Sequence, residues 1–552
     1  MARFIIMFIA FGMIFVSLAA YQPNWVWMQR TTGSGNCRFY NTTTDSQGRT
    51  VAVGYIEGEV TIGLQALTST GPRDGVVAML DASGEWLWAI AIGGEGSDYI
   101  HKLTTDNQDN IYIAGAFSQS FSIAELELIS NGGNDILFAK LDSDGNVLNA
   151  SSVGSVYNDL PGGIAVTPTG EIYLAGQYRN SITIGNTTLT SSSYALFYSK
   201  WDASLNPLWA QQGFSILPTL ECVSLGSDTA GNLYIVGNFQ QQCSFGSPNQ
   251  IVLASNNISG FIFKLSPEGN GIWGERVSSG NFSILDAFVD PSGNTYVSGD
   301  YTFIIESPGE GDKRLDTMPR CGKLGSNGYW QWYEPFADMD GCVFVRIRGD
   351  AAGNTYLTGF LWDSFDFGGF LLSGSFDTEN VFVAKGNPAG QWQWGIQTQD
   401  AGSIFYLGIS DISPLPSGDC IITGWNRGES LHFGDFHVSP STSVYSFLVR
   451  VNADLTSNQD ALEMPSHPRI QVWPNPSGDQ TEFLLLGSKA TISEASVYNL
   501  KGQLVRQIPR HGHSGSLIWD GYDDDGRKSP RGVYIMHLES GGKNYSKVFS
   551  RL

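Results

Sequence analysis

Histidines and serines are the first residues to search for catalytic or metal chemistry. The seven histidines are scattered, and the closest pair, His511 and His513, has no carboxylate or cysteine cluster beside it at metal-ligand spacing. No Gly-x-Ser-x-Gly sequence marks an activated serine nucleophile. We therefore predict no catalytic residue, no metal site and no cofactor of these kinds, and a protein that is not an enzyme.

Acidic turns are the next candidates, because carboxylates bind calcium. The segment DGYDDDGRK (520–528) fails as an EF-hand loop, since its first ligand position would be Gly521 and its twelfth Gly532. A turn is the better interpretation. The segment LDSDGN (141–146) offers too few acids for more than a weak calcium site.

Glycoside hydrolysis would need two carboxylates facing each other. Asp286, Asp338 and Asp400 could supply such a pair if the fold brought two of them together. The turn DASGEWLW (81–88) resembles the Asp-box turn of sialidases, where it is structural. The arginines are few and hold no repeated position, so no substrate-carboxylate cluster is predicted, and solvated loop acids are the favoured interpretation.

Tryptophans could stack on sugar rings. Three pairs lie two residues apart and so share a strand face: Trp86 with Trp88, Trp330 with Trp332, and Trp392 with Trp394. Since the pairs recur regularly, packing between sheets explains them better than binding. Trp362 and Trp425 lie outside this register and are the better ligand candidates, although packing is the favoured role for them too.

Six cysteines follow the first twenty residues and none forms a CxxC pair, so zinc and thioredoxin-like chemistry are disfavoured. Disulfides are the remaining option in an oxidising compartment, with the pairing left open. Proximity suggests Cys222 with Cys243 and Cys321 with Cys342, which would leave Cys37 to join Cys420.

Composition and charge narrow the class of protein. Among 552 residues there are 66 glycines, only 15% charged residues and 12% aromatics, which is typical of many short strands joined by tight turns. The net charge of -22 argues against nucleic acid or anionic membranes as partners. Residues 1–20, with Arg3, an apolar run and then small residues, predict a secretory signal peptide, and no later run is apolar enough to serve as a transmembrane anchor.

A decapeptide, DAAGNTYLTG (350–359), recurs along the chain and identifies a repeat. Successive copies are 60 to 65 residues apart. The first positions of their turn-and-strand core are Gly48, Asp109, Gly170, Gly231, Gly293, Gly353 and Gly418.

The repeats also contain an apolar residue followed by a small one, except the fifth, which has Ser307 and Pro308 there. A hydrophobic strand and a tryptophan strand follow, in alternating pattern. NWVWMQ (24–29) supplies a tryptophan strand at the start of the first unit. About four antiparallel strands per unit make a sheet that must stack on its neighbours. We therefore predict an all-β, seven-bladed β-propeller of four-stranded antiparallel blades over residues 24–455.

This region resembles a known family. Residues 87–117, LWAIAIGGEGSDYIHKLTTDNQDNIYIAGAF, are similar to the bacterial SBBP-type repeat of seven-bladed propellers. The resemblance extends with varying quality over residues 24–455 and implies ring closure by seven blades.

The repeat ends after Leu455, and a polar linker is predicted over 456–468. Residues 469–552 alternate strand-like pieces with sharp turns, enough for a small Ig-like β-sandwich. The tail resembles the C-terminal sorting (Por) domain of type IX secretion substrates of Bacteroidetes-like bacteria. The principal matching residues are Trp473, Pro474, Asn475, Pro476, Gly502, Trp519, Gly521, Gly526, Gly532 and Tyr534.

By this resemblance, the signal peptide delivers the chain to the periplasm and an outer-membrane secretion machinery reads the tail. The protein would then be secreted or displayed on the surface of a Gram-negative bacterium. We expect a non-enzymatic propeller that binds or scaffolds a glycan, matrix or protein ligand through blade loops. The alternative is a secreted polysaccharide hydrolase or lyase with its site at the channel mouth, and fold alone does not choose between them.

Overall fold

The structure is a computed structural model in which the chain is all-β. It describes residues 23–551 apart from 125, 218–219, 278–280, 307–312, 336–341, 368–369, 373–379, 399–406, 429, 439–440, 453–468, 474–480, 487–491, 509–515 and 541–542. The predicted signal peptide, the linker, and the tail residues Pro474, Asn475 and Pro476 lie outside the described residues. Nowhere in the described ranges is there a helix long and apolar enough to cross a membrane.

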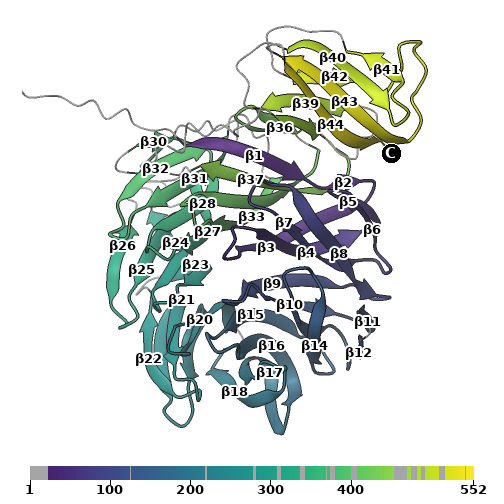
Figure 1. Ribbon diagram of the computed structural model, residues 1–552. Helices are drawn as coiled ribbons and strands as arrows, with labels where there is room; N and C mark the ends of the chain where they lie inside the picture. Colours follow the sequence, from purple (N-terminus) through teal and green to yellow (C-terminus); the bar gives the residue numbers. More distant parts are fainter. Residues whose placement is uncertain are drawn as a thin grey trace, which may run out of the picture.

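The first part of the chain is a β-propeller-like ring of antiparallel four-stranded units (Figure 1). In sheet order, the first three units are β3(Asn36–Thr44), β4(Thr50–Glu57), β7(Asp74–Leu80), β8(Trp86–Gly94); β9(Tyr99–Thr105), β10(Ile111–Phe117), β13(Asp135–Leu141), β14(Val147–Val153); and β15(Leu160–Val166), β16(Ile172–Ile184), β17(Thr187–Trp201), β18(Pro207–Ser215).

The remaining units follow the same order. They are β19(Glu221–Ser227), β20(Leu233–Phe245), β21(Ile251–Leu265), β22(Gly271–Arg276); β23(Asn281–Val289), β24(Thr295–Glu306), β25(Lys313–Leu324), β26(Trp330–Pro335); β27(Cys342–Gly349), β28(Thr355–Leu361), β31(Asn380–Gly386), β32(Trp392–Gln397); and β33(Leu407–Pro414), β34(Cys420–Asn426), β37(Tyr445–Asn452), β1(Asn24–Arg30).

The ring is joined by its first strand. β1 pairs with β37, with Met28 opposite Val449, so the chain's beginning completes the last unit (Figure 1). The sequence pattern assigned NWVWMQ to the first unit. In the structure this segment is instead the outer tryptophan strand of the last unit, because β37 ends at Asn452 and no tryptophan strand of the repeat follows it in the sequence.

Side chains of each strand alternate between two cores. Val51 and Val53 of β4 pack against the second unit, including Ile113, whereas Ala52 packs toward Trp27 and Leu448 of the last unit. Because both faces of the sheet are covered, β4 is an almost continuous apolar run. The expectation that neighbouring sheets stack on one another is confirmed.

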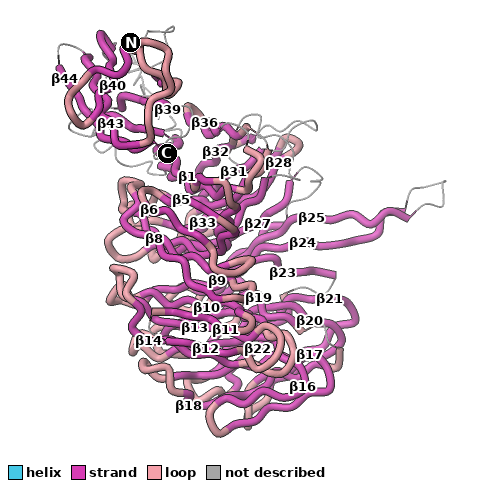
Figure 2. The backbone as a smooth tube through the Cα atoms, turned by 90° about the vertical axis from the view of Figure 1, so that its right-hand side faces the viewer, coloured by secondary structure: helices cyan, strands magenta, loops and turns pink. Residues whose placement is uncertain are grey.

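Hairpin extensions leave the outer half of several units. They are built from β2(Thr32–Gly33), β5(Glu59–Ile62), β6(Gln65–Thr68), β11(Ser120–Ile123), β12(Leu126–Ile129), β29(Phe365–Asp366), β30(Leu371–Leu372), β35(Leu431–Phe433) and β36(Phe436–Val438). The recurring apolar-then-small pair lies at these hairpin tips: Ile62 is buried, and Gly63 has a φ of 60° that favours glycine. β24 and β25 form the longest projecting arm (Figure 2).

Neighbouring units are connected by recurring hydrogen bonds, and this explains the repeated decapeptide. In DAAGNTYLTG, the Asp350 carboxylate accepts the backbone N–H of Asn354 at 2.8 Å and closes the turn, in which Gly353 has a φ of 85°. The Tyr356 hydroxyl lies 3.2 Å from that carboxylate and donates to the Gly418 carbonyl of the next unit at 2.8 Å. The same role recurs at Tyr173, whose hydroxyl donates to a neighbouring carbonyl at 2.7 Å.

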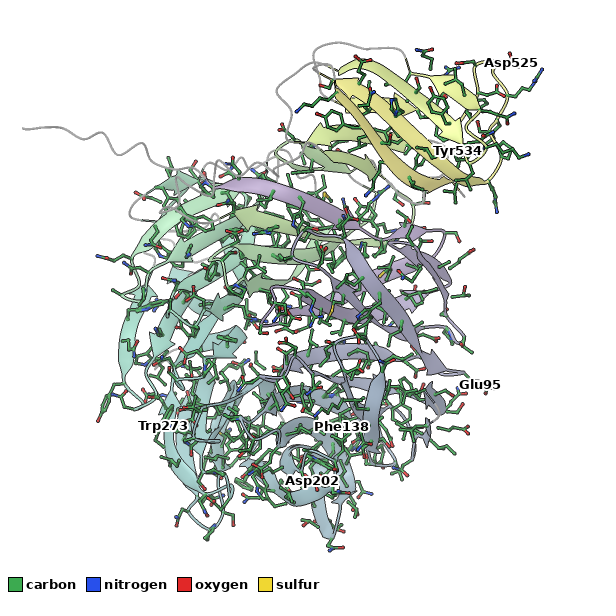
Figure 3. The ribbon with its side chains drawn as sticks, viewed as in Figure 1. Glu95, Phe138, Asp202, Trp273, Asp525 and Tyr534 are labelled. Atoms are coloured by element: carbon green, nitrogen blue, oxygen red, sulfur yellow. The ribbon has the colours of Figure 1, made fainter. Side chains whose placement is uncertain are left out.

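The tail is a separate pair of antiparallel sheets. One contains β38(Arg469–Trp473), β39(Thr481–Leu486) and β42(Ser516–Trp519); the other contains β41(Leu504–Gln507), β40(Ile492–Asn499), β43(Gly532–Ser540) and β44(Lys543–Arg551). Tyr534, labelled in Figure 3, is buried in their common core with Trp519 and Phe549. The Trp519 indole donates to the Tyr522 carbonyl at 2.8 Å, and Gly502, Gly521 and Gly526 lie in turns with positive φ.

The disulfides suggested by proximity are not formed. Cys222 and Cys243 are free buried thiols: Cys222 faces Gly237, and Cys243 lies six residues further along β20, roughly 20 Å of strand. Cys342 is also a free thiol and lies on a different sheet from Cys321.

The third suggested disulfide, between Cys37 and Cys420, is also not formed. Cys37 lies near the beginning of β3, whereas Cys420 directly follows the turn that ends β33. These positions are at opposite ends of the sheets, and both side chains are free buried thiols.

Candidate functional site

The innermost strands of all units surround a central cavity of about 650 Å³. Its lining includes the ends of β3, β9, β15, β19, β23, β27 and β33 together with the turns that follow them: residues 41–45, 102–107, 163–168, 223–229, 286–289, 291, 348–351 and 413–416. We call this side, where those turns lie, the turn end of the channel. The opposite side, where the innermost strands begin, is the loop end.

A β-bulge occurs at the same place in every innermost strand. The extra residues are Tyr40, His101, Gly162, Val223, Leu285, Val345 and Ser410. A bulge re-aims side chains and bends the strand. The bulges therefore form a ring of special positions around the channel, and most units place small or aliphatic residues there.

An ion-pair triad connects three neighbouring innermost strands just beyond this ring. Arg348 Nη1 lies 2.5 Å from Asp286 Oδ2, and Arg348 Nη2 lies 2.5 Å from Asp411 Oδ1. The other Asp411 oxygen accepts the backbone N–H of Thr42 at 3.0 Å. The Arg348 guanidinium thus connects β23, β27 and β33, and Asp411 extends the connection to β3.

Burial and charge oppose each other in this triad. Burial alone would lower the pKa of Arg348, but Asp286 and Asp411 raise it above its ordinary value. Burial raises the pKa of Asp411, and Arg348 acts against that shift. Since both carboxylates accept hydrogen bonds from one cation, neither is placed as a free acid or base for glycoside hydrolysis.

Two more cations, Lys102 in the cavity lining and Arg346 on β27, donate to backbone carbonyls. Lys102 Nζ donates to the Val223 carbonyl at 2.9 Å, and burial lowers the pKa of this lysine. Arg346 donates to the carbonyls of Val345 and Ser410. Arg346 thereby joins neighbouring units at a bulge, whereas the Lys102 contact joins the second unit to the fourth.

A second group of polar side chains gathers at the loop end. We define the loop-end cluster as Arg38, Tyr40, Tyr55, Arg73, Tyr99, His101 and Trp425. It comes from the first, second and last units, which are neighbours because the ring closes through β1.

Aromatic rings in the cluster form a continuous series. The His101 ring centroid lies 4.4 Å from that of Tyr40 and 4.4 Å from that of Tyr99, and the Tyr40 centroid lies 5.6 Å from that of Tyr55. Tyr40, Tyr99 and His101 are half-buried, so each keeps some accessible surface.

Two arginines lie against these aromatic rings. The Arg38 guanidinium is 4.3 Å from the Trp425 centroid and 5.4 Å from the Tyr40 centroid. Arg73 is 4.1 Å from the Tyr55 centroid and pairs with Glu57 at 2.6 Å. Contacts of this kind are cation–π interactions.

The cluster is arranged to hold neutral rings beside a cation. Burial, followed by the charges of Lys102 and Arg38, lowers the pKa of His101 to about 4. Burial raises the pKa of Tyr40 to about 12. At neutral pH, His101 and Tyr40 are therefore uncharged donors and acceptors of hydrogen bonds.

The residues singled out from the sequence have varied positions. Trp425 lies under Arg38 in the loop-end cluster, whereas Trp362 packs against the core shared by the last two units. Asp286 belongs to the channel triad, and Asp338 and Asp400 lie outside the described residues. The tryptophan pairs pack between sheets, as at Trp88, whose indole donates to the Ser143 carbonyl of the next unit at 3.1 Å.

The candidate calcium turns use their acids locally. The Asp142 carboxylate accepts the backbone N–H groups of Asp144 and Asn146 at 3.0 and 2.8 Å, and Asp523 accepts that of Arg527 at 2.7 Å. Within the described ranges, no group of three or more His, Cys, Asp or Glu side chains is placed to hold a metal ion.

Sequence reasoning missed most of the cluster and the triad, including Arg38, Tyr40, His101, Arg348 and Asp411. A signal was present. Counting back from each turn to the bulge position gives Tyr40 and His101 in adjacent units and no other aromatic residue around the ring. The interruption of the repeat, rather than the repeat itself, marks the cluster.

Comparisons with known proteins identify no family. No family model matches the chain, and no curated protein matches its sequence. One similar structure is PorZ, an essential bacterial surface component of the type IX secretion system of Porphyromonas gingivalis, with 10% identity over 95% of this chain and 100% of that chain and a TM-score of 0.27.

Two further similar structures are a PL25 ulvan lyase and the WD40 domain of Neurospora crassa Pan2. The lyase has 9% identity over 75% of this chain and 96% of that chain, with a TM-score of 0.39. The Pan2 domain has 11% identity over 77% of this chain and 97% of that chain, with a TM-score of 0.36. At this level of similarity we rely on the chain's own strand order for the fold and on its own side chains for function.

Proposed function

We propose that this chain is an exported, non-enzymatic binding protein that recognises its ligand at the loop end of a closed seven-bladed propeller. The observation that carries the proposal is the loop-end cluster, where the repeat is interrupted in neighbouring units by polar aromatic side chains and Arg38. Elsewhere, recurring polar groups such as the Tyr356 hydroxyl bond one unit to the next. Functional side chains on a repeat scaffold are expected where the repeat is broken.

The proposed organisation has four parts. Residues 1–20 are a signal peptide, 24–455 the propeller of the SBBP type, 456–468 a linker, and 469–552 an Ig-like type IX sorting domain. The tail's separate core around Trp519 and Tyr534 supports a distinct domain. The proposed destination is the outside of a Gram-negative cell, reached through the outer-membrane secretion machinery.

Export is tested by comparing the full chain with one ending at residue 468, in a bacterium that has type IX secretion. Protease added to intact cells, together with immunoblots of the medium, reports the location of each chain. We expect the full chain outside the cell and the shortened chain in the periplasm. Equal export of both would refute the sorting role of the tail.

Binding is tested on the mature chain, residues 21–552, with glycan and matrix-protein arrays followed by titration. We expect a saturable ligand whose binding weakens in Tyr40→Ala. Saturable binding unaffected by substitutions throughout the loop-end cluster would place the site elsewhere.

The alternative is a secreted polysaccharide hydrolase or lyase with its site at the mouth of the channel on the same loop end. One observation favours it: the uncharged His101 lies beside Tyr40, and a neutral imidazole can accept a proton. Reducing-end release and absorbance of unsaturated products from acidic polysaccharides distinguish the two functions. Turnover abolished by His101→Ala would establish the enzyme and overturn the binding-only role.

A further inference from the structure

Arg38 is a cation without an acidic partner among the described residues. Its guanidinium contacts aromatic rings on Trp425 and Tyr40, and its Nε is buried without a hydrogen-bond partner. By contrast, Arg73 in the same cluster is neutralised by Glu57. A guanidinium held in this way retains N–H donors for a carboxylate or sulfate group.

The net charge of the protein makes this half-buried cation unusual. The chain carries a net charge of -22, so its long-range field repels anions. An anionic ligand of Arg38 must therefore gain its affinity from close contact rather than from electrostatic steering. Close contact requires other groups around Arg38 that fit the rest of the ligand.

The rings of Tyr40, His101 and Tyr99 supply such groups. Their centroids follow one another at 4.4 Å, and all three side chains are half-buried. Ring faces can pack against the C–H face of a sugar, while the Tyr hydroxyls and the imidazole edge can bond to sugar hydroxyls. The cluster thus combines one guanidinium that has no acidic partner in the described ranges with an adjacent aromatic and hydrogen-bonding surface.

We propose that the loop-end cluster binds an acidic sugar, with the sugar ring on the Tyr40–His101–Tyr99 series and its carboxylate or sulfate paired with Arg38. This inference rests on the proposed binding function and specifies the ligand's chemistry. A neutral sugar would leave the Arg38 guanidinium unpaired, and a simple anion would leave the aromatic series unused.

Calorimetric titration of the mature chain tests the proposal with three probes of matched length: an oligogalacturonate, a sulfated carrageenan oligosaccharide and a neutral cello-oligosaccharide. We expect saturable binding of at least one acidic probe, about tenfold or more tighter than the neutral one. The two acidic probes distinguish carboxylate from sulfate as the anionic group.

Substitutions locate the site. Arg38→Gln should weaken acidic binding by about tenfold or more, and Arg38→Lys should weaken it less because the charge remains without the planar fork. Tyr40→Phe should retain more affinity than Tyr40→Ala, because it keeps the ring. Arg276→Gln is the matched control: it removes the same charge from β22, where Arg276 donates to the Ala254 carbonyl at 2.9 Å, and should leave affinity within about twofold.

The outcomes separate this inference from the proposed function. A neutral ligand that binds at Tyr40 as tightly as the acidic probes, or equal losses in Arg38→Gln and Arg276→Gln, would overturn the acidic-sugar inference and leave a binding protein. No saturable ligand in the probes or in broader arrays would overturn both. Circular dichroism of each variant checks folding, and the graded Arg38→Lys and Tyr40→Phe variants keep the test valid if a larger change unfolds the chain.

Discussion

Arg348 and Asp411 form an ion pair across two neighbouring units, with Arg348 Nη2 2.5 Å from Asp411 Oδ1. Asp411 is fully buried, and Arg348 also pairs with Asp286. Neither carboxylate is therefore unpaired, as the acid or base of a glycosidase would need to be. The geometry of the pair instead describes a structural tie between the units.

Removing the cation of this triad should be strongly destabilising. In Arg348→Met, Asp286 and Asp411 would remain buried without their partner, so the free energy of unfolding should fall by about 3–5 kcal/mol. Urea denaturation followed by fluorescence measures the loss. The control is a neutral triple variant with Asp286→Asn, Arg348→Met and Asp411→Asn. It should have a higher free energy of unfolding than Arg348→Met alone, because no unpaired charge remains buried. A lower free energy of unfolding in the triple variant would contradict the proposed charge compensation.

The sequence predicted the strands and stacked sheets because glycine turns, apolar alternation and tryptophans recur every 60 to 65 residues. It could not assign β1 to the last unit, because the pairing of Met28 with Val449 joins residues more than 400 positions apart. The triad was hidden for a similar reason: Asp286, Arg348 and Asp411 become neighbours only when the strands converge on the channel.

The loop-end cluster was only partly predictable. Trp425 stood out because it interrupts the repeat directly after a strand glycine, but Arg38 and His101 lie on innermost strands whose sequences vary between units. Counting back from the turns makes Tyr40 and His101 equivalent positions, but only the bulges, which add one residue to each of these strands, distinguish this position from the rest of the strand.

The hydrogen bond between units at Tyr356 should contribute measurably to stability. Tyr356→Phe removes the hydroxyl that contacts Asp350 and donates to the Gly418 carbonyl, so the free energy of unfolding should fall by about 1–2 kcal/mol. Chemical denaturation gives the value. Tyr329→Phe, at a side chain that is 74% exposed, is the matched control and should change stability by less than about 0.5 kcal/mol. Similar losses in the two variants would argue against the inter-unit bond.

Ring closure through β1 should depend on the inward face of that strand. Trp27 is 2% exposed and belongs to a core that includes Ala52 and Leu448, so Trp27→Ala should cost about 3–5 kcal/mol. Val26, the preceding residue, is 37% exposed, and Val26→Ala should cost less than about 1 kcal/mol. Thermal unfolding and size-exclusion chromatography of both variants test whether closure rests on the buried side chain; equal stability would refute it.

Asp159 should make stability fall as pH rises. Burial raises its pKa to about 7, although its carboxylate accepts the backbone N–H of Ser155 at 2.6 Å. A folded-state pKa above the unfolded value of about 3.9 means that the folded chain binds more protons between these values. The stabilising contribution is therefore fully present below about pH 4 and is lost as pH rises through 7.

The Asp159→Asn variant isolates this contribution because its side chain does not titrate. The free energy of unfolding of the wild type minus that of the variant should decrease steadily from pH 4 to pH 8 in urea titrations. Asp202→Asn is the opposite control: Asn206 lowers the pKa of Asp202, so the wild type's advantage over this variant should be present above about pH 4 and should disappear as pH falls. A difference for Asp159→Asn that is constant with pH, or that increases with pH as for Asp202→Asn, would show that burial does not hold the Asp159 proton in the folded protein.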